Sequence, residues 1–249
     1  MTDVEAASGS GPVLAVFAHP DDAEICAGGT LAKWIAAGRE VHLLILTNGD
    51  RGSSDPAIDR AALAATRRTE TEAAAAKLGL SSARSLDVHD GELENSPAAR
   101  EAVVRRIREV RAETVVSCDP TAVFVQVPAE DGKEPKTAYN HSDHRTAGAI
   151  ALDAVFPGSG NPHFFSEHLA EGLEVREVHD VWLGWTNEPN HLEDVTDHFD
   201  AKVAALGEHV SQITEGIRLW DEWMRAEAKV AGERIGVGLA EEFRVLDLS

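Results

Sequence analysis

Short apolar runs alternate along the chain with longer stretches of helical periodicity, and this alternation constrains the fold more than any other feature of the sequence. Val13 to Ala18 is an uninterrupted apolar run, as expected of a strand buried on both faces, and Val41 to Leu46 is a second such strand. Further strands are expected at 84–88, 114–117 and 178–183. Helices are expected at 23–37, 57–79, 98–111 and 146–155, with two amphipathic helices between about 199 and 230.

This order of elements predicts a single α/β domain, Rossmann-like in architecture, with a mainly parallel twisted sheet and helices on both faces. No linker divides the chain, so residues 12–249 are expected to form the domain, and the polar, Gly/Ser-rich residues 1–11 a mobile tail. If the strand order is 3-2-1-4-5, it reverses between the first and fourth strands. Ligands of such sheets bind at the carboxyl ends of the strands beside that reversal.

Charge and composition narrow the possible partners. The 249 residues include 43 acidic and 23 basic side chains, a net charge of −20. Such a surface repels phosphate backbones and anionic lipids, which argues against nucleic acid and membrane partners. The first residues do not have the pattern of a signal peptide, no apolar run approaches the length of a membrane span, and only Cys26 and Cys118 carry thiols. We therefore expect a soluble cytoplasmic protein.

A cluster of metal-binding and acidic side chains follows the first strand directly, in the sequence Ala18-His19-Pro20-Asp21-Asp22-Ala23-Glu24. His19 and Asp22 are three residues apart, so one turn can direct both side chains at a single ion. Asp21 then points elsewhere and stays free. In the alternative interpretation, one of the two aspartates simply caps the following helix, which leaves His19 unexplained.

A second cluster, Tyr139-Asn140-His141-Ser142-Asp143-His144-Arg145, precedes the helix expected at 146–155. It follows the fourth strand through a loop of about 25 residues, a length that is often functional. Here the alternative is capping by Ser142 or Asp143, with two surface histidines. Since both clusters follow strands beside the expected reversal, we predict that they form one site.

Two histidines and one carboxylate, with a position left open for water, form the ligand set of many catalytic zinc sites. Zn²⁺ activates water and polarises a carbonyl group. Asp21 is then available as general base, and His141 could stabilise the oxyanion or protonate the leaving amine. The two clusters therefore predict a zinc-dependent hydrolase.

The motif AHPDDAE followed by HSDH resembles the PIG-L/LmbE family of N-acetylglucosaminyl deacetylases. The resemblance covers about residues 13–245. It includes the turn 47–52, Arg67 and Glu70 before Leu78-Gly79, the turn Asp90-Gly91, and a late helix from Lys202 to Gln212.

The resemblance implies a role for each matching residue. The implied zinc ligands are His19, Asp22 and His144. The implied catalytic residues are Asp21 as general base, His141 as the oxyanion or acid group, and Asp143 as a partner that orients a histidine. The implied substrate-binding residues are Arg67, Asp90 and Arg51. His209 and Gln212 are interpreted as structural.

The resemblance also implies an activity, the removal of an N-acetyl group from an amino-sugar conjugate of the GlcNAc type, and relatives often assemble into trimers or hexamers. The loop at 121–136 matches no pattern of the family, which leaves the substrate open. One alternative is an amidase that cleaves a larger acyl group from a thiol-sugar or antibiotic conjugate. Another is a catalytically inactive metal-binding protein. A nucleotide-binding protein is disfavoured, because His19-Pro20-Asp21-Asp22 occupies the turn where a Gly-rich fingerprint would lie.

Overall fold

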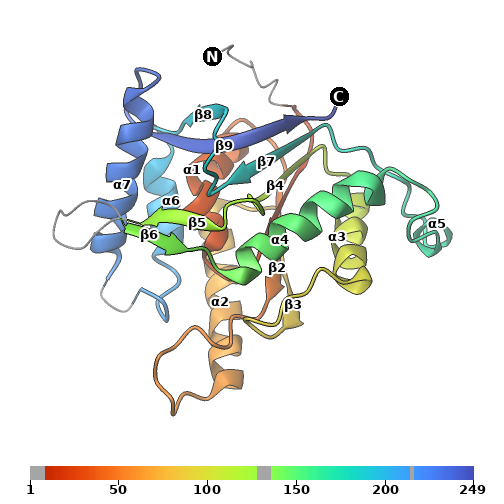
Figure 1. Ribbon diagram of the computed structural model, residues 1–249, viewed down its shortest axis with the longest axis horizontal. Helices are drawn as coiled ribbons and strands as arrows, with labels where there is room; N and C mark the ends of the chain where they lie inside the picture. The colour runs from red at the N-terminus through yellow and green to blue at the C-terminus, as the bar shows by residue number, and fades with distance from the viewer. Residues whose placement is uncertain (1–8, 128–135, 214–215) are drawn as a thin grey trace.

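A seven-stranded sheet forms the centre of the computed structural model, which describes residues 9–127, 136–213 and 216–249 (Figure 1). Its strand order is β3-β2-β1-β4-β7-β9-β8, and the first five of these are parallel. The parallel strands are β1 (Val13–Phe17), β2 (Val41–Thr47), β3 (Ser82–Val88), β4 (Thr114–Cys118) and β7 (Asp180–Gly184). The predicted order 3-2-1-4-5 is therefore confirmed, with β7 as the fifth strand.

Helices cover both faces of the sheet, as predicted. One core cluster joins α1 (Asp22–Ala36) and the end of α2 (Arg60–Leu78) to the sheet. The other cluster joins α3 (Pro97–Val110) and α4 (Ser142–Asp153) to the opposite face. Residues of β1 alternate between the two clusters, so a strand whose residues are all apolar is buried on both sides. The remaining helices are α5 (Glu167–Ala170), α6 (Phe199–Leu206), α7 (Ile217–Glu233) and a π-helical turn at Ala154–Ser159 that follows α4.

Two antiparallel strands at one end of the sheet are absent from the prediction. β9 (Ala240–Asp247) pairs antiparallel with β7, and β8 (His191–Asp194) pairs antiparallel with β9. Because β9 lies near the end of the sheet, its sequence alternates between core and solvent and includes several charged residues. The prediction of a mainly parallel sheet holds, but the sheet is larger than expected.

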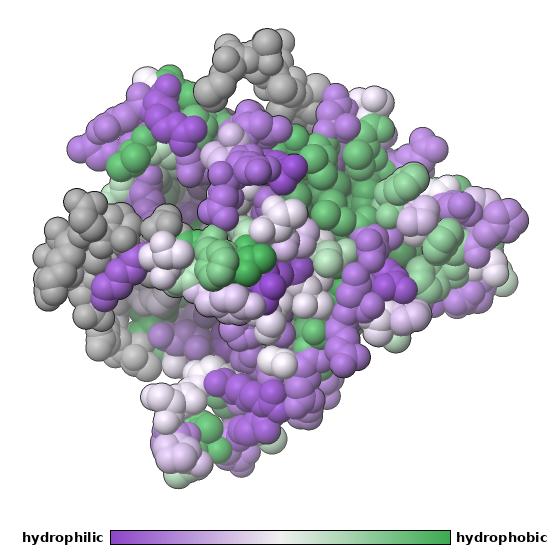
Figure 2. Space-filling view, in the orientation of Figure 1, coloured by the Kyte–Doolittle hydropathy of each residue, from purple (hydrophilic) through white to green (hydrophobic). Residues whose placement is uncertain are grey.

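The prediction of a long loop after the fourth strand is wrong for much of that segment. β5 (Phe124–Val127) and β6 (Lys136–Tyr139) pair antiparallel, with Phe124 opposite Tyr139. Figure 2 shows a small hydrophobic area near β5, and a larger one at the upper right of the same face. Residues 128–135 of this predicted loop lie outside the described residues, as do residues 1–8 of the predicted tail.

Helix α4 packs unusually close to β4. A Cβ atom built on Gly148 would lie 2.1 Å from the carbonyl oxygen of Cys118. Only glycine therefore lets the helix approach the sheet to this distance. The N-terminus of α4 lies near the carboxyl ends of β1 and β4, which is where both sequence clusters were expected. Within the described residues, no helix is long and apolar enough to cross a membrane.

Candidate active site

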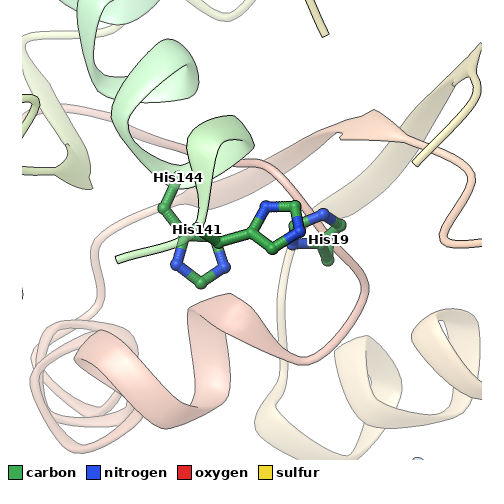
Figure 3. Close-up of side chains that lie close together, drawn as sticks. All are labelled: His19, His141 and His144. Carbon is green, nitrogen blue, oxygen red and sulfur yellow. The ribbon is translucent and has the colours of Figure 1, made fainter. Parts of the chain in front are cut away.

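The two predicted clusters meet at the carboxyl edge of the sheet. His19 follows β1, and His141 and His144 lie at the start of α4. Figure 3 shows the rings of the two α4 histidines beside that of His19. The ring centroid of His19 is 4.7 Å from that of His141 and 5.1 Å from that of His144. Residues more than 120 positions apart in the chain thus share one site, because β1 and β4 are neighbouring parallel strands.

The buried carboxylate of Asp22 faces two of these histidines. One of its oxygens is 3.4 Å from Nδ1 of His19, and the other is 3.2 Å from Nε2 of His144. The backbone N–H of His19 also donates to Asp22, at 2.8 Å, which fixes the orientation of the carboxylate. Two ligands of a tetrahedral zinc ion, each about 2.1 Å from the metal, are about 3.4 Å apart. Each of the two carboxylate–histidine distances is therefore close to the distance between two ligands of one small cation, and the two histidines face different oxygens of Asp22.

The opposite ring nitrogens of the same two histidines face acceptors. Nε2 of His19 lies 3.2 Å from Oδ1 of Asp90 and 3.5 Å from Oδ2 of Asp143. Nδ1 of His144 lies 3.1 Å from Oδ1 of Asn140. Histidines that bind metals commonly direct their second ring nitrogen at an oxygen, which fixes the tautomer and the ring orientation. The contact of His144 with Asn140 is a hydrogen bond, whereas Nε2 of His19 lies near its two carboxylates without one among the described residues. This arrangement leaves Nδ1 of His19 and Nε2 of His144 available to a metal.

Carboxylates dominate the charge of the site. Burial alone would lower the pKa of His19, but Asp22, Asp143 and Asp90 together raise it to about 12. Although burial opposes it, His144 and His19 hold the pKa of Asp22 well below its ordinary value. The site thus has an excess of negative charge that a cation would compensate. Among the described residues, two groups could each hold an ion: His19 with His141 and His144, and His19 with Asp90 and Asp143.

Asp21 has a strained backbone and does not cap the helix that it precedes. Its φ of 96° lies in the left-handed region, and in the described structure its side chain makes no capping hydrogen bond to α1. The carboxylate is instead 3.2 Å from Nη2 of Arg67. Burial raises the pKa of Asp21 to about 6, against the opposing effect of Arg67. The capping alternative therefore does not describe Asp21.

His141 is the residue that caps α4, rather than Ser142 or Asp143 as the alternative interpretation had it. Its Nδ1 accepts the backbone N–H of Asp143 at 3.1 Å. In the neutral ring the proton is therefore on Nε2, which lies 4.0 Å from Oδ1 of Asp90. The side chain is 43% exposed, so this N–H can reach a ligand. Partial burial, together with His19 and His144, lowers the pKa of His141 and favours the neutral ring.

The remaining predicted residues surround the histidines. Asp143 is buried and accepts the N–H of Gly91 at 2.7 Å. Arg51 is partly exposed and donates to the carbonyl of Asp90 at 2.6 Å. Asp90 therefore lies between His19 and Arg51. Arg67 is buried beside Asp21.

Three further residues at the site were missed by the sequence analysis. Asn140 holds His144 and directly precedes His141, so its place in the motif could have identified it. Trp185 follows β7 and its ring centroid lies 4.7 Å from that of His144, at the carboxyl end of a strand beside the site. Asp50 accepts the N–H of Asp90 at 3.1 Å and so supports the turn. Asp50 lies in the turn 47–52 that takes part in the family resemblance, and that match could have identified it.

Comparison with known proteins agrees with this geometry. Residues 14–155 match the family model of PIG-L, described as GlcNAc-PI de-N-acetylase. Diacetylchitobiose deacetylase of Thermococcus kodakarensis is 33% identical over 233 residues, which cover 93% of this chain and 82% of that protein. The 1D-myo-inositol 2-acetamido-2-deoxy-alpha-D-glucopyranoside deacetylase of Rhodococcus erythropolis is 27% identical over 253 residues, 81% of each chain.

The fold agrees as well. The solved structure of N,N'-diacetylchitobiose deacetylase from Pyrococcus horikoshii, in complex with its inhibitor MPG, superposes with a TM-score of 0.81 at 32% identity. The match covers 95% of this chain and 84% of that one. Because the family model covers more than half of the chain and the first relative nearly all of it, this protein belongs to the PIG-L family of deacetylases.

Proposed function

We propose that this protein is a zinc-dependent hydrolase that removes the acetyl group from an N-acetylated amino sugar of the GlcNAc type. The observation that carries the proposal is the position of Asp22 between His19 and His144, preceded in the chain by Asp21, whose carboxylate is paired with Arg67. The names of the relatives support the substrate class, since they describe deacetylases of diacetylchitobiose and of an inositol-linked acetamido sugar.

The proposed metal ligands are His19 through Nδ1, Asp22 through its carboxylate, and His144 through Nε2. The short distances from Asp22 to both histidines support this set, as does the contact of Asn140 with Nδ1 of His144, which leaves Nε2 to the metal. Two nitrogen ligands and one oxygen ligand suit Zn²⁺ better than Mg²⁺ or Ca²⁺, which prefer oxygen. When bound, the ion supplies a Lewis acid that polarises the amide carbonyl and makes water a stronger nucleophile near neutral pH.

The side chains around the ligands supply the proton transfers and the hydrogen bonds. Asp21 accepts the proton of the attacking water and passes a proton to the amine nitrogen as the C–N bond breaks. The Nε2–H of His141 donates to the carbonyl oxygen as negative charge develops on it. The products are acetate and the free amino sugar. Asp143, which faces the ring of His19, keeps that ligand oriented.

An acetate-release assay tests the proposal directly. The substrates are N-acetylglucosamine, N,N'-diacetylchitobiose and N-acetylglucosaminyl-inositol. Chelated protein is compared with protein reconstituted with Zn²⁺. We expect equimolar acetate and free amine from at least one substrate, only in the presence of Zn²⁺. A panel of conjugates with longer acyl groups distinguishes the amidase alternative, which would release the longer acid in preference to acetate. If zinc-loaded protein released neither acetate nor a longer acid, both the deacetylase and the amidase function would be contradicted.

A further inference from the structure

Trp185 lies on strained backbone directly after β7, at the carboxyl edge of the sheet. Its φ of 50° is in the left-handed region, which is uncommon for a residue with a bulky side chain. The indole lies beside the ring of His144, with the two centroids 4.7 Å apart and the ring planes inclined by 33°. Trp185 is half-buried, and part of it packs against the core cluster that contains Phe17. The strained backbone thus presents a large apolar ring to the site.

A buried aspartate holds the residues on both sides of Trp185. Asp119 follows β4 and is 1% exposed. Its backbone N–H donates to the carbonyl of Gly184 at 2.9 Å, and its Oδ2 accepts the hydroxyl of Thr186 at 2.6 Å. Gly184 has no space for a side chain, because a Cβ atom there would lie 2.2 Å from Sγ of Cys26. The backbone that carries the indole is therefore fixed at both ends, which keeps the ring beside the site.

The two substituents of the scissile amide point in opposite directions. In a planar trans amide, the carbon attached to the nitrogen and the carbon attached to the carbonyl lie on opposite sides of the C–N bond. Asp90, which the family resemblance implies for sugar binding, has Oδ1 3.2 Å from Nε2 of His19 and 4.0 Å from Nε2 of His141. Trp185 lies instead against His144. A sugar bound on the Asp90 side therefore directs its acyl group toward the His144 side, where the indole lies.

We propose that the indole of Trp185 bounds the space for the acyl group, and that it limits the substrate to acetyl. This inference rests on the proposed function, because it takes the amide carbonyl to lie beside His141 and the sugar to lie on the side of Asp90. It deepens that function by naming the residue that excludes longer acyl chains. An indole on fixed backbone cannot move aside for an added methylene group. Such a misfit in an apolar site lowers kcat/KM by about 10- to 200-fold.

The acyl-chain selectivity of Trp185 variants tests the proposal. The substrates are the three amino sugars of the acetate-release assay, each carrying acetyl, propanoyl, butanoyl or hexanoyl groups, and the released acid is measured with zinc-loaded protein. Trp185→Gly removes the indole and suits the backbone, since glycine adopts a positive φ without strain. Trp185→Phe keeps a smaller ring. Trp220→Leu is the matched control, because Trp220 is also half-buried but packs against a third core cluster, formed around α6 and α7.

Wild-type protein should prefer acetyl, with kcat/KM at least about tenfold lower for propanoyl. Trp185→Gly should raise kcat/KM for butanoyl above the wild-type value, and should increase the butanoyl-to-acetyl ratio by at least about tenfold. A variant that was merely less stable would lower the turnover of all acyl chains together, so this gain identifies a role in selectivity. Trp185→Phe should give an intermediate ratio, and Trp220→Leu should keep the wild-type ratio.

An unchanged acyl ratio in both Trp185 variants, with acetate still released, would overturn the role of Trp185 and leave the deacetylase function in place. Equal turnover of acetyl and hexanoyl substrates by wild-type protein would overturn it as well. Release of no acid from any substrate by zinc-loaded wild-type protein would instead contradict the proposed function, and the acyl limit with it. If circular dichroism shows that Trp185→Gly does not fold, the ratio measured for Trp185→Phe decides.

Discussion

The two segments that form the site differ in how the side chain at the N-cap of each helix is used. After β1, Asp21 stands at the N-cap of α1, yet its carboxylate turns to Arg67 and its backbone is strained. Before α4, His141 caps the helix with Nδ1, while Nε2 lies 4.0 Å from Oδ1 of Asp90. In the described structure the Asp21 carboxylate therefore makes no capping hydrogen bond to α1. At α4 the His141 ring both caps the helix and lies beside His19 in the site.

This difference has a practical consequence for mutagenesis. His19 and Asp22 are buried, whereas the side chain of His141 is 43% exposed. Substitutions after β1 therefore change metal binding or proton transfer in a closed environment. Substitutions before α4 change stability and turnover at once, unless the new side chain keeps the cap. The predictions below separate these effects.

The largest effect is expected from removing one proposed ligand in each segment. Wild-type protein should hold about one divalent ion per chain, and the double variant His19→Ala/His144→Ala should hold none. The exposed His163 lies elsewhere, so His163→Ala serves as control and should keep its metal. Elemental analysis after dialysis measures the content. Equal metal in wild type and double variant would show that the ion binds elsewhere.

Asp21 and Asp22 are adjacent in sequence, but their amide variants should fail in different ways. Asn tolerates a positive φ, so Asp21→Asn should keep the turn and the zinc. Because it cannot take a proton from water, turnover should fall by about 10²- to 10⁴-fold. Asp22→Asn should lose zinc instead. Metal content and kcat are measured on both variants. If both lose zinc equally, with equal residual activity, the division of roles is wrong.

His141→Asn tests the residue that serves two purposes. Asn is a good N-cap, so the free energy of unfolding should stay near that of wild type, whereas His141→Ala should lose about 1 kcal/mol. Both variants lack the Nε2–H and should lose about 10²- to 10³-fold in kcat. Chemical denaturation and steady-state kinetics provide the two measurements. Normal turnover in His141→Asn would make the residue purely structural, and loss of zinc would make it a ligand.

The smallest effect is expected at a cap that has no second role. The hydroxyl of Ser96 accepts the N–H of Ala99 at 3.2 Å and caps α3. Ser96→Ala should reduce the free energy of unfolding by about 1 kcal/mol and leave kcat and zinc content unchanged. Thermal unfolding and the acetate assay check this. A marked loss of kcat would mean that cap losses alone reduce turnover, and the His141 result would then need reinterpretation.

The parallel part of the sheet could be predicted because most of its strands are short apolar runs, although β3 at the edge carries Ser, Arg and Asp. β9 could not, since charged residues such as Glu242 and Arg244 interrupt its apolar pattern. The β5–β6 hairpin was missed for another reason. Phe124–Val127 favours a strand, but a long stretch rich in Pro, Gly and charged residues separates it from its partner, and no short turn motif marks the pairing.

The meeting of His19 with His144 was predicted from strand order, although His144 follows β4 only after the β5–β6 hairpin. Neighbouring parallel strands end at the same edge, so residues just after them come together. The conformation of Asp21 does not follow from sequence, because it depends on contacts with Arg67, a residue 46 positions away. The sequence analysis considered Ser142 or Asp143 as the N-cap of this helix and not His141, because histidine is not among the preferred N-cap residues.

Gly148 carries no functional group, yet it determines how closely α4 packs on the sheet. Any side chain there would meet the Cys118 carbonyl and push the helix outward, and the two histidines at its N-terminus would move with it. Tolerance to substitution in this enzyme is therefore not a matter of distance from the reacting atoms alone. A search for variants with altered activity should include Gly148, because there even an added methyl group would displace the residues at the start of α4 without altering any of them.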